Sequence, residues 1–389
     1  MPSATVSSKI PLTKRLYPAP NEVAKPLYEK SRLTALAKKT TNKMGGEGRF
    51  VIIKDAGISG VGHTFADALA TQGTDTPARF FVQRRKLYVI GTIQNELKVA
   101  VNGDKNSVLE AVRTEMDSAR YAFARVHGTA VYGNGGGAIG QLAASVTLAS
   151  TTLALRNRTD MAALERNYWL EFSSDNGTGT SPAGRRSSGG VPVRLQLTGG
   201  INRSLGTGTV SALLNTVPSI TADDFVFIRG SYAAAPTGIR GWLPPTAPTA
   251  AEDFQGVDRT DYDLTRVAGV RVNGNGLSKL ELMENVGAEA VVAGLSGDMT
   301  MFVNPVDWRD FRKELGNAVQ YMDVTTKVGV GFKAIEFVSQ AGVIKVIPEI
   351  DCPFGYSPLI DPSDVEIASA GELPMELTYA NGQMLIAHD

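Results

Sequence analysis

The longest hydrophobic pattern in the chain is helical and runs from Ser107 to Tyr132. Its apolar positions recur every three or four residues, at Val108, Val112, Met116, Ala119, Phe123, Val126 and Ala130. This spacing places them on one face of an α-helix. The polar residues predicted to face water are Glu110, Arg113, Asp117 and Arg120. Ser107 and Glu110 have the spacing of a capping box, and Gly133 is a stop signal.

Two stretches rich in aromatic and β-branched residues predict a long β-ribbon. They are Arg49–Lys54 and Arg79–Ile90, and both have the composition of strands. The connection Gly57–Pro77 is rich in glycine and threonine, with Phe65 and Leu69 as its main large apolar residues. A connection of this composition buries too little area to repay its own ordering. Because a two-stranded ribbon cannot bury its apolar face alone, we expect it to lie on something else.

Beyond residue 141 the pattern changes to short strands separated by glycine-rich turns. The predicted strands are Ser145–Leu155, Tyr168–Ser173, Val191–Thr198, Gly208–Leu214 and Asp224–Arg229. This spacing predicts a small antiparallel barrel or sandwich, inserted within a larger domain.

Two helices and three strands are predicted after a proline-rich bend. Ser278 and Glu281 form a capping box before the first helix, and Asn304 precedes Pro305 as the N-cap of the second. The strands are Phe332–Ser339, Val343–Pro348 and Pro358–Ile360. Near the N-terminus a short helix is predicted within Pro26–Lys39. These elements predict an α+β fold in which helices cover a mixed sheet.

Charge is balanced over the whole chain but uneven along it. The 389 residues hold 39 basic and 39 acidic side chains, which argues against a surface devoted to nucleic acid or an anionic membrane. The first 50 residues, however, hold ten bases against three acids, a net charge of +7. A basic, proline-rich arm is typical of segments that bind nucleic acid or an acidic protein surface, and a solvated tail has the same composition. No apolar run approaches the ~20 residues that span a bilayer, so a soluble protein is expected.

The residues that could carry chemistry form no catalytic pattern. Cys352 is the only cysteine, and three histidines are too few for a histidine-rich metal site. The segment Gly133–Gly140 follows a helix and lacks the Lys-Ser/Thr ending of a nucleotide-binding loop, so we interpret it as the turn that ends the helix. His127, near that helix end, and the acidic residues around Asp223 and Asp258 are interpreted as structural. No catalytic residue, cofactor or metal is predicted.

The parts follow one another as a basic arm, a ribbon, a long helix, a strand-rich module, a helix-and-sheet domain and a return segment. Several segments have a distinctive amino-acid sequence: LYEKSRLTALAKKT, MGGEGRFVIIK, SVLEAVRTEMDSARYAFARVHGTAVYGNGGGAIGQL, IRGWLPPTAP, TRVAGVRV, TMFVNPVDWRDFRKELG and GVIKVIPEIDCPFGYSPLI. In this order they resemble the arm, E-loop, spine helix, main body and axial domain of the major capsid proteins of tailed bacteriophages, which have the Hong Kong 97 fold. The resemblance covers most of the chain apart from about residues 141–229.

The resemblance implies an α+β fold of the Hong Kong 97 type with peripheral and axial domains and an inserted β module. The implied segments are a basic arm at 1–48, the E-loop ribbon at 49–93, the peripheral domain with its spine helix at 94–140, the β module at 141–230, a return to the peripheral domain at 231–277, the axial domain at 278–360 and a second return at 361–389. Family members usually continue with a further long strand, so the resemblance leaves open a missing C-terminal portion.

The resemblance also implies a structural protein and not an enzyme. Such subunits assemble as hexamers and pentamers into an icosahedral shell that encloses double-stranded DNA without reading its sequence. The implied partners are copies of the same chain, a scaffolding protein, a portal and, in some members, a decoration protein. The implied location is the virion capsid, assembled in the host cytoplasm without a membrane. The candidate subunit contacts are Phe65, Arg84, Arg85, Lys14 and Arg15.

Two alternatives remain open. An encapsulin-like nanocompartment shell protein has the same fold but normally lacks a strand-rich insertion. A glycan-binding adhesin would account for the glycine, threonine and strand content. The long helix and the lack of a signal-peptide apolar segment count against the adhesin.

Overall fold

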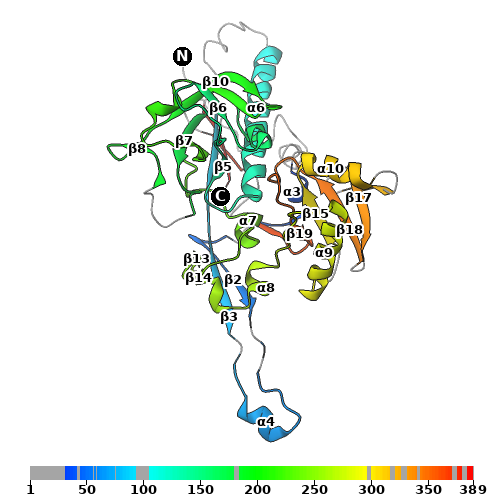
Figure 1. Ribbon diagram of the computed structural model, residues 1–389. Coiled ribbons are helices and arrows are strands. Elements are labelled where there is room, and N and C mark those ends of the chain that lie inside the picture. Colours follow the sequence, from blue (N-terminus) through cyan, green and yellow to red (C-terminus); the bar gives the residue numbers. More distant parts are fainter. Residues whose placement is uncertain are drawn as a thin grey trace.

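The computed structural model describes residues 31–41, 44–55, 57, 59–74, 76–92, 105–178, 184–295, 299–315, 320–325, 331–339, 342–369, 375–378 and 383–388. The molecule is a mixture of helices and sheets, as the sequence pattern predicts. In Figure 1 a β module and a helix-covered sheet flank one long helix, and a narrow ribbon projects from the body. No helix in the described part of the chain is long and apolar enough to cross a membrane.

The long helix is α6 (Lys105–Val131), and its predicted apolar face is confirmed where side chains are described. Met116, Ala119 and Phe123 are buried, and the last two share a cluster with residues of β4 (Leu87–Thr92). Strand β4 belongs to a three-stranded sheet with the strands β21 (Met375–Thr378) and β22 (Gln383–His388). The long helix is therefore braced by a sheet built from both halves of the chain.

Two details of the helix prediction are wrong. The helix begins at Lys105, so Ser107 lies inside it and is not its N-cap. Arg120 is buried instead of facing water, and its guanidinium pairs with Asp117 at 2.8 Å. An arginine can cover apolar surface with its aliphatic stem while its charge is satisfied locally, which a polar-face rule does not anticipate.

The N-terminal part of the described chain forms a strap across the body. The predicted helix is shorter than expected: α3 (Arg32–Leu36) ends before Lys38 and Lys39, which lie in β1 (Lys38–Thr41). Strand β1 pairs in parallel with β20 (Glu366–Ser369). This tertiary pairing overrides the local helix propensity of the two lysines.

The ribbon consists of β2 (Gly48–Lys54) and β3 (Pro77–Gln83) in antiparallel register. The second predicted run, Arg79–Ile90, is wrong as a single strand. It divides at residues 84–86, after which β4 leaves the ribbon to pair with β22. The connection, expected to bury too little area to repay its own ordering, contains the helix α4 (Phe65–Ala70) at the tip of the ribbon.

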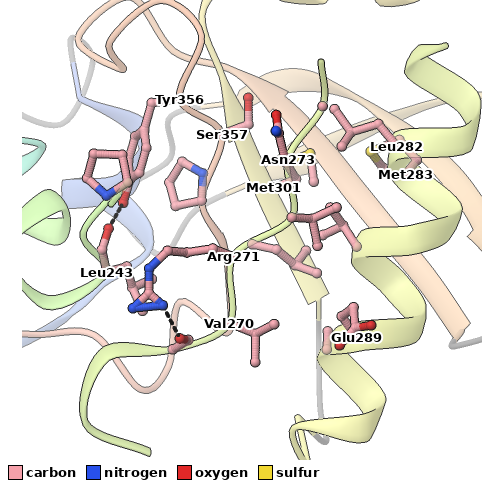
Figure 2. Close-up of a pocket in the computed structure, with 18 of the residues that line it drawn as sticks. Leu243, Val270, Arg271, Asn273, Leu282, Met283, Glu289, Met301, Tyr356 and Ser357 are labelled. Carbon is pink, nitrogen blue, oxygen red and sulfur yellow. Dashed lines mark hydrogen bonds between the residues drawn. The ribbon is translucent and has the colours of Figure 1, made fainter. Parts of the chain in front are cut away.

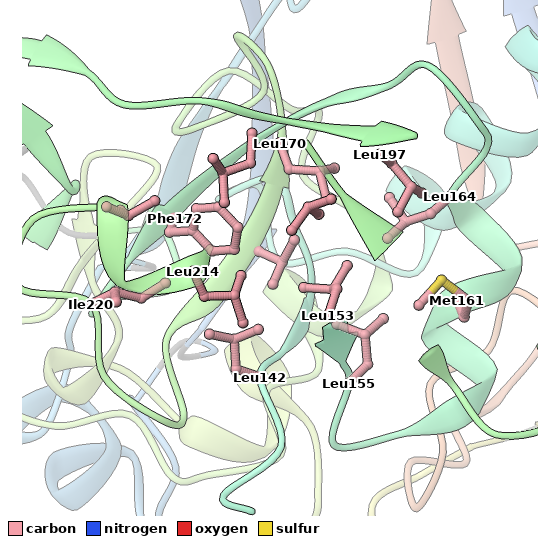
Figure 3. Close-up of a cluster of buried hydrophobic side chains, with 14 residues drawn as sticks. Leu142, Leu153, Leu155, Met161, Leu164, Leu170, Phe172, Leu197, Leu214 and Ile220 are labelled. Atoms are coloured by element: carbon pink, nitrogen blue, oxygen red, sulfur yellow. The ribbon is translucent and has the colours of Figure 1, made fainter. Parts of the chain in front are cut away.

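The strand-rich module is a closed antiparallel barrel, as the strand spacing predicts. Its strand order is β5-β12-β7-β10-β11-β6. The bounds are β5 (Ala138–Gln141), β6 (Thr152–Ala154), β7 (Trp169–Ser173), β10 (Leu195–Asn202), β11 (Thr207–Val210) and β12 (Phe225–Ile228). A bridge between Leu142 and Leu155 joins the two edges and closes the sheet. Figure 3 shows the leucine-rich core that the barrel encloses.

Several strand boundaries in this module were predicted incorrectly. The predicted run Val191–Thr198 divides into Val191–Pro192 and β10, and the run Gly208–Leu214 is a strand only up to Val210. Only Thr152–Ala154 of the predicted run Ser145–Leu155 is a strand, and turns occupy most of its first half. The first barrel strand begins at Ala138, within the glycine-rich segment. Smaller elements of the module are η1 (Arg158–Ala163), η3 (Leu214–Thr216) and the hairpin of β8 (Ser187–Ser188) and β9 (Val191–Pro192).

The second folded body is a five-stranded mixed sheet with the order β16-β17-β18-β15-β19. Its strands are β15 (Met299–Val303), β16 (Gln320–Thr325), β17 (Gly331–Ser339), β18 (Gly342–Pro348) and β19 (Leu359–Ile360). Both predicted helices are confirmed. Helix α9 (Lys279–Val292) has the capping box of Ser278 and Glu281, and Asn304 caps α10 (Pro305–Leu315) through a 3.1 Å bond from the Val306 amide.

A connecting region joins the bodies and supports the ribbon. It contains α7 (Ile239–Trp242), β13 (Asp253–Phe254), β14 (Val257–Asp258), η4 (Arg259–Asp261) and α8 (Leu264–Ala268). Figure 1 shows these elements beside the base of β2 and β3.

Candidate functional site

The glycine-rich segment after α6 is tightly packed against other parts of the chain. A Cβ atom added at Gly136 would lie 2.0 Å from the Asn176 carbonyl oxygen, and one at Gly137 would lie 2.0 Å from that of Ser231. Neither glycine can therefore carry a side chain without a clash against the backbone of another segment. Gly137 also has a φ of +85°, which glycine adopts at little cost. These contacts agree with the interpretation of the segment as a tightly packed turn.

Cys352 and His127, the residue types that could act as a nucleophile and a base, are buried in the core. Cys352 is 1% exposed, its Sγ donates to the Tyr356 carbonyl at 3.1 Å, and burial raises the pKa of its thiol well above the ordinary value. A protonated, inaccessible thiol is a poor nucleophile. His127 is 4% exposed and stacks on Phe123 with ring centroids 5.7 Å apart. Both residues therefore serve packing.

A cavity of about 920 Å³ lies between α9, the segment after α8 and the mixed sheet. Figure 2 shows that apolar side chains such as Leu282, Met283 and Met301 form much of its wall. Arg271 donates to the Gly269 carbonyl at 3.0 Å. The Tyr356 hydroxyl donates to the Leu243 carbonyl at 2.8 Å. The Tyr356 hydroxyl and one Arg271 nitrogen thus bind the protein's own backbone, whereas the Nε and Nη2 atoms of Arg271 are buried without a hydrogen-bond partner among the described residues.

Two carboxyl groups, the buried Glu349 and the half-buried Asp160, have a raised pKa. Glu349 is 2% exposed and accepts from the Arg32 amide at 2.5 Å, which ties the first turn of α3 to the mixed sheet. Burial raises the pKa of Glu349 to about 8, and the nearby Asp351 adds to the effect. Burial likewise raises the pKa of Asp160 to about 7, against the opposing influence of a hydrogen bond from Asn157. Glu349 anchors the N-terminal strap through the Arg32 amide.

The inner face of the ribbon is part of the subunit's own core. Ala78 and Phe80 are fully buried in a cluster with Val257 and Val267. The Phe80 ring meets that of Trp242 with centroids 5.3 Å apart in an edge-on arrangement. The expectation that the ribbon lies on something else is confirmed for this face, because the connecting region covers it.

The outer face of the ribbon carries an exposed apolar stripe. Side chains alternate across a strand, so Phe50 and Ile52 point away from the core, and they are 63% and 60% exposed. Phe50 lies opposite Phe81 on β3, with ring centroids 5.1 Å apart. The exposed Lys54 and Arg79 share this face by register. We call the set Phe50, Ile52, Phe81, Lys54 and Arg79 the ribbon stripe.

The tip of the ribbon is a formed but unsupported knob. Thr64 caps α4 by accepting from the Asp67 amide at 3.2 Å, and the Ser59 hydroxyl donates to the Thr71 carbonyl at 2.7 Å. None of the six residues of α4 is buried. Phe65 and Leu69, one helical turn apart, are 83% and 57% exposed. Isolated helices this short are marginal in water, so the knob lacks the packing that normally stabilises a helix.

The structure places the predicted contact residues in separate regions. Phe65 lies at the tip, whereas Arg84 and Arg85 lie half-buried at the other end of the ribbon, between β3 and β4. The Arg84 amide donates to the Glu47 carbonyl at 2.8 Å. Lys14 and Arg15 lie outside the described residues. Sequence reasoning did not single out the ribbon stripe, although the alternation of Phe50, Val51 and Ile52 carries the signal.

Comparison of the chain with protein-family models and with curated protein sequences gives no match. Within the described residues, no group of three or more His, Cys, Asp or Glu side chains could hold a metal ion. The surfaces with the clearest unmet physical requirement are the ribbon stripe and the tip, and the functional argument proceeds from them.

Proposed function

We propose that this chain is a structural subunit that assembles with copies of itself into a closed shell, as the major capsid proteins of tailed bacteriophages do. One observation carries the proposal: the ribbon ends in a folded tip with none of its helical residues buried. A surface of exposed aromatic and aliphatic side chains on a projecting arm costs free energy in water unless a partner covers it. A neighbouring copy is the partner that a shell supplies at every position.

The arrangement of the other elements supports the same function. A strap, a two-stranded ribbon, a long helix on a three-stranded sheet and a separate helix-covered mixed sheet occur here in the order that Hong Kong 97-type subunits have. The barrel is then an insertion between α6 and the connecting region. Peripheral and axial domains of this type would correspond to the α6 body and the mixed-sheet body.

The contents and partners of the shell follow from charge as proposals. The first 50 residues carry a net charge of +7, which suits nonspecific attraction to double-stranded DNA phosphates. A scaffolding protein, a portal and a decoration protein are the further partners proposed, with the virion as the location. None of these roles requires a catalytic group, which agrees with the packing roles of Cys352 and His127.

The test is the mass and shape of the particles that the purified protein forms. We expect light scattering after size exclusion to show species of five and six subunits or closed shells as the protein concentration rises, with and without a co-expressed scaffolding protein. Electron microscopy of the same fractions should show rings or shells of uniform diameter. A monomer at all concentrations, with and without scaffold, would contradict the proposed function.

A further inference from the structure

The ribbon has opposite charges at its two ends. Residues 56–76, which form the tip beyond Asp55, contain two acids and no lysine or arginine. The stem segments 47–54 and 77–86 contain six bases and one acid. Like the charges, the apolar side chains are divided between two surfaces, one at the tip and one on the stem.

The tip surface is a convex knob. Phe65 and Leu69 lie on one side of α4, and Val61, which is 82% exposed, adds a third apolar side chain close in sequence. The acidic Asp67 lies on the same short helix, where its carboxylate accepts from the Thr64 hydroxyl at 2.6 Å. Internal bonds therefore favour the folded form of the knob, and a partner supplies the packing that α4 lacks.

The stem surface is the ribbon stripe, and it is complementary to the knob. Phe50, Ile52 and Phe81 offer an extended apolar strip, and the cations Lys54 and Arg79 border it. The strip is held in place because the opposite ribbon face is buried against the connecting region. Asp55 fixes the end of the stem as well, since its carboxylate accepts from the Asp263 amide at 2.5 Å.

The knob cannot reach the stripe of its own chain, because the two surfaces lie at different positions along one ribbon (Figure 1). We propose that the knob of one copy docks on the ribbon stripe of the next copy, with Phe65 and Leu69 against Phe50, Ile52 and Phe81. The tip is acidic and the stem is basic, so the two surfaces attract one another. The contact joins two different surfaces, so it repeats head to tail and closes into a ring when the rotation between copies permits. This inference rests on the proposed function and names the receiving surface within it.

The knob and the stripe are disabled separately in two variants. Phe65→Asp removes the apolar anchor of the knob at a position where acids favour a helix N-terminus, so α4 is retained. The double variant Phe50→Thr/Ile52→Thr removes the stripe with residues that favour strands. Val338→Thr is the matched control, because Val338 is a strand residue that is 74% exposed away from the ribbon. Circular dichroism and thermal melting establish that each variant is folded, and Arg79→Glu replaces the double variant if that one does not fold.

The decisive measurement is the mass of the complexes, by sedimentation, for each variant and for an equimolar mixture of the knob and stripe variants. The knob variant and the stripe variant, each measured alone, should bind about thirtyfold or more weakly than the wild type, which is the loss expected for an interface anchor. Val338→Thr should associate as the wild type does. In the mixture, an intact knob meets an intact stripe once per pair, so heterodimers should form and nothing larger. Raising the salt concentration should weaken this heterodimer, because exposed charges are screened.

The outcomes separate this inference from the proposed function. A mixture that stays monomeric, or a stripe variant that forms rings and shells as the wild type does, would overturn the knob-and-stripe contact and leave the shell function standing. A wild-type chain that never associates overturns both.

Discussion

At the scale of single residues, the side chains of α6 differ in how much burial each contributes to stability. Phe123 is 1% exposed and contributes to the cluster between the helix and β4. Phe123→Ala should lower the free energy of unfolding by about 3–5 kcal/mol, since it removes buried apolar area and leaves a cavity. Arg113 is exposed, and Arg113→Ala should cost less than about 0.5 kcal/mol. Chemical denaturation that gives equal losses for the two variants would contradict the assignment of the buried face.

The buried Glu349 makes stability depend on pH. The groups around it are Arg32 from α3, Tyr132 after α6, and Asp351 and Cys352 from its own loop. The pKa of Glu349 is raised from 4.5 to about 8 in the folded chain, so the folded state holds the proton more tightly than the unfolded state. The stability from this proton is fully present below about pH 4.5 and is lost as the pH rises towards 8.

We therefore expect the free energy of unfolding to fall between pH 5 and pH 8. One such group contributes at most about 1.4 kcal/mol per pH unit, and Asp160 acts in the same direction up to about pH 7. Glu349→Gln should flatten the dependence, whereas Glu289→Gln on the exposed side of α9 should leave it unchanged. Urea denaturation at pH 5, 6, 7 and 8 measures how the free energy of unfolding changes with pH. If Glu349→Gln shows the same change as the wild type, Glu349 is not the group that causes it.

At the scale of elements, the barrel has the features of an independently folding unit. Its core is its own, and its two ends are joined by hydrogen bonds: the Ala233 amide donates to the Gly136 carbonyl at 2.8 Å, and the Gly238 amide to that of Gly133 at 3.1 Å. Residues 133–238 expressed alone should therefore fold cooperatively. Circular dichroism and dispersed amide resonances would show this. The fragment with Phe172→Ala should be strongly destabilised, and a disordered wild-type fragment would show that the barrel needs the rest of the chain.

The elements that local sequence signals predict well are those whose signals lie within one or two turns. The capping box at Ser278 and the Asn304–Pro305 start fix α9 and α10 because a side chain and a nearby amide satisfy each other. Helix α4 has a comparable signal in Thr64 and Asp67, but its six residues are too few to show a helical periodicity. The glycines and threonines on either side of α4 place this signal within a segment whose composition does not favour regular structure.

Elements that depend on distant partners could not be predicted from local pattern. The division of the run Arg79–Ile90 results from the pairing of β4 with β22, nearly 300 residues away in the chain. Strand β1 exists because β20 lies beside it. For the candidate site, Phe65 was identified from its composition, whereas the ribbon stripe required knowledge of which ribbon face the connecting region covers.

At the scale of the whole molecule, the two faces of the ribbon separate folding from assembly. The stem contributes Ala78 and Phe80 to the core, and Asp55 binds the Asp263 amide and the Arg266 guanidinium of the connecting region. Beyond Asp55 the described residues up to Thr76 are exposed or half-buried. The stem is therefore required for the fold of its own subunit, and the tip is available to another molecule.

Deleting the tip should abolish assembly and leave the subunit folded. Replacing residues 57–75 with Asn-Gly retains Asp55 and the register of Lys54 with Pro77, so a short hairpin loop can still close the stem. The far-ultraviolet circular dichroism should stay close to that of the wild type, and the melting temperature should change little because no residue of α4 is buried. Electron microscopy should show no rings or shells, since the apolar knob is absent. A variant that replaces the same residues with a scrambled order of their own sequence is the control for loop length, and it should also fail to assemble. Intact particles formed by the variant without the tip would contradict the proposal. If that variant does not fold, the tip belongs to the core of its own subunit.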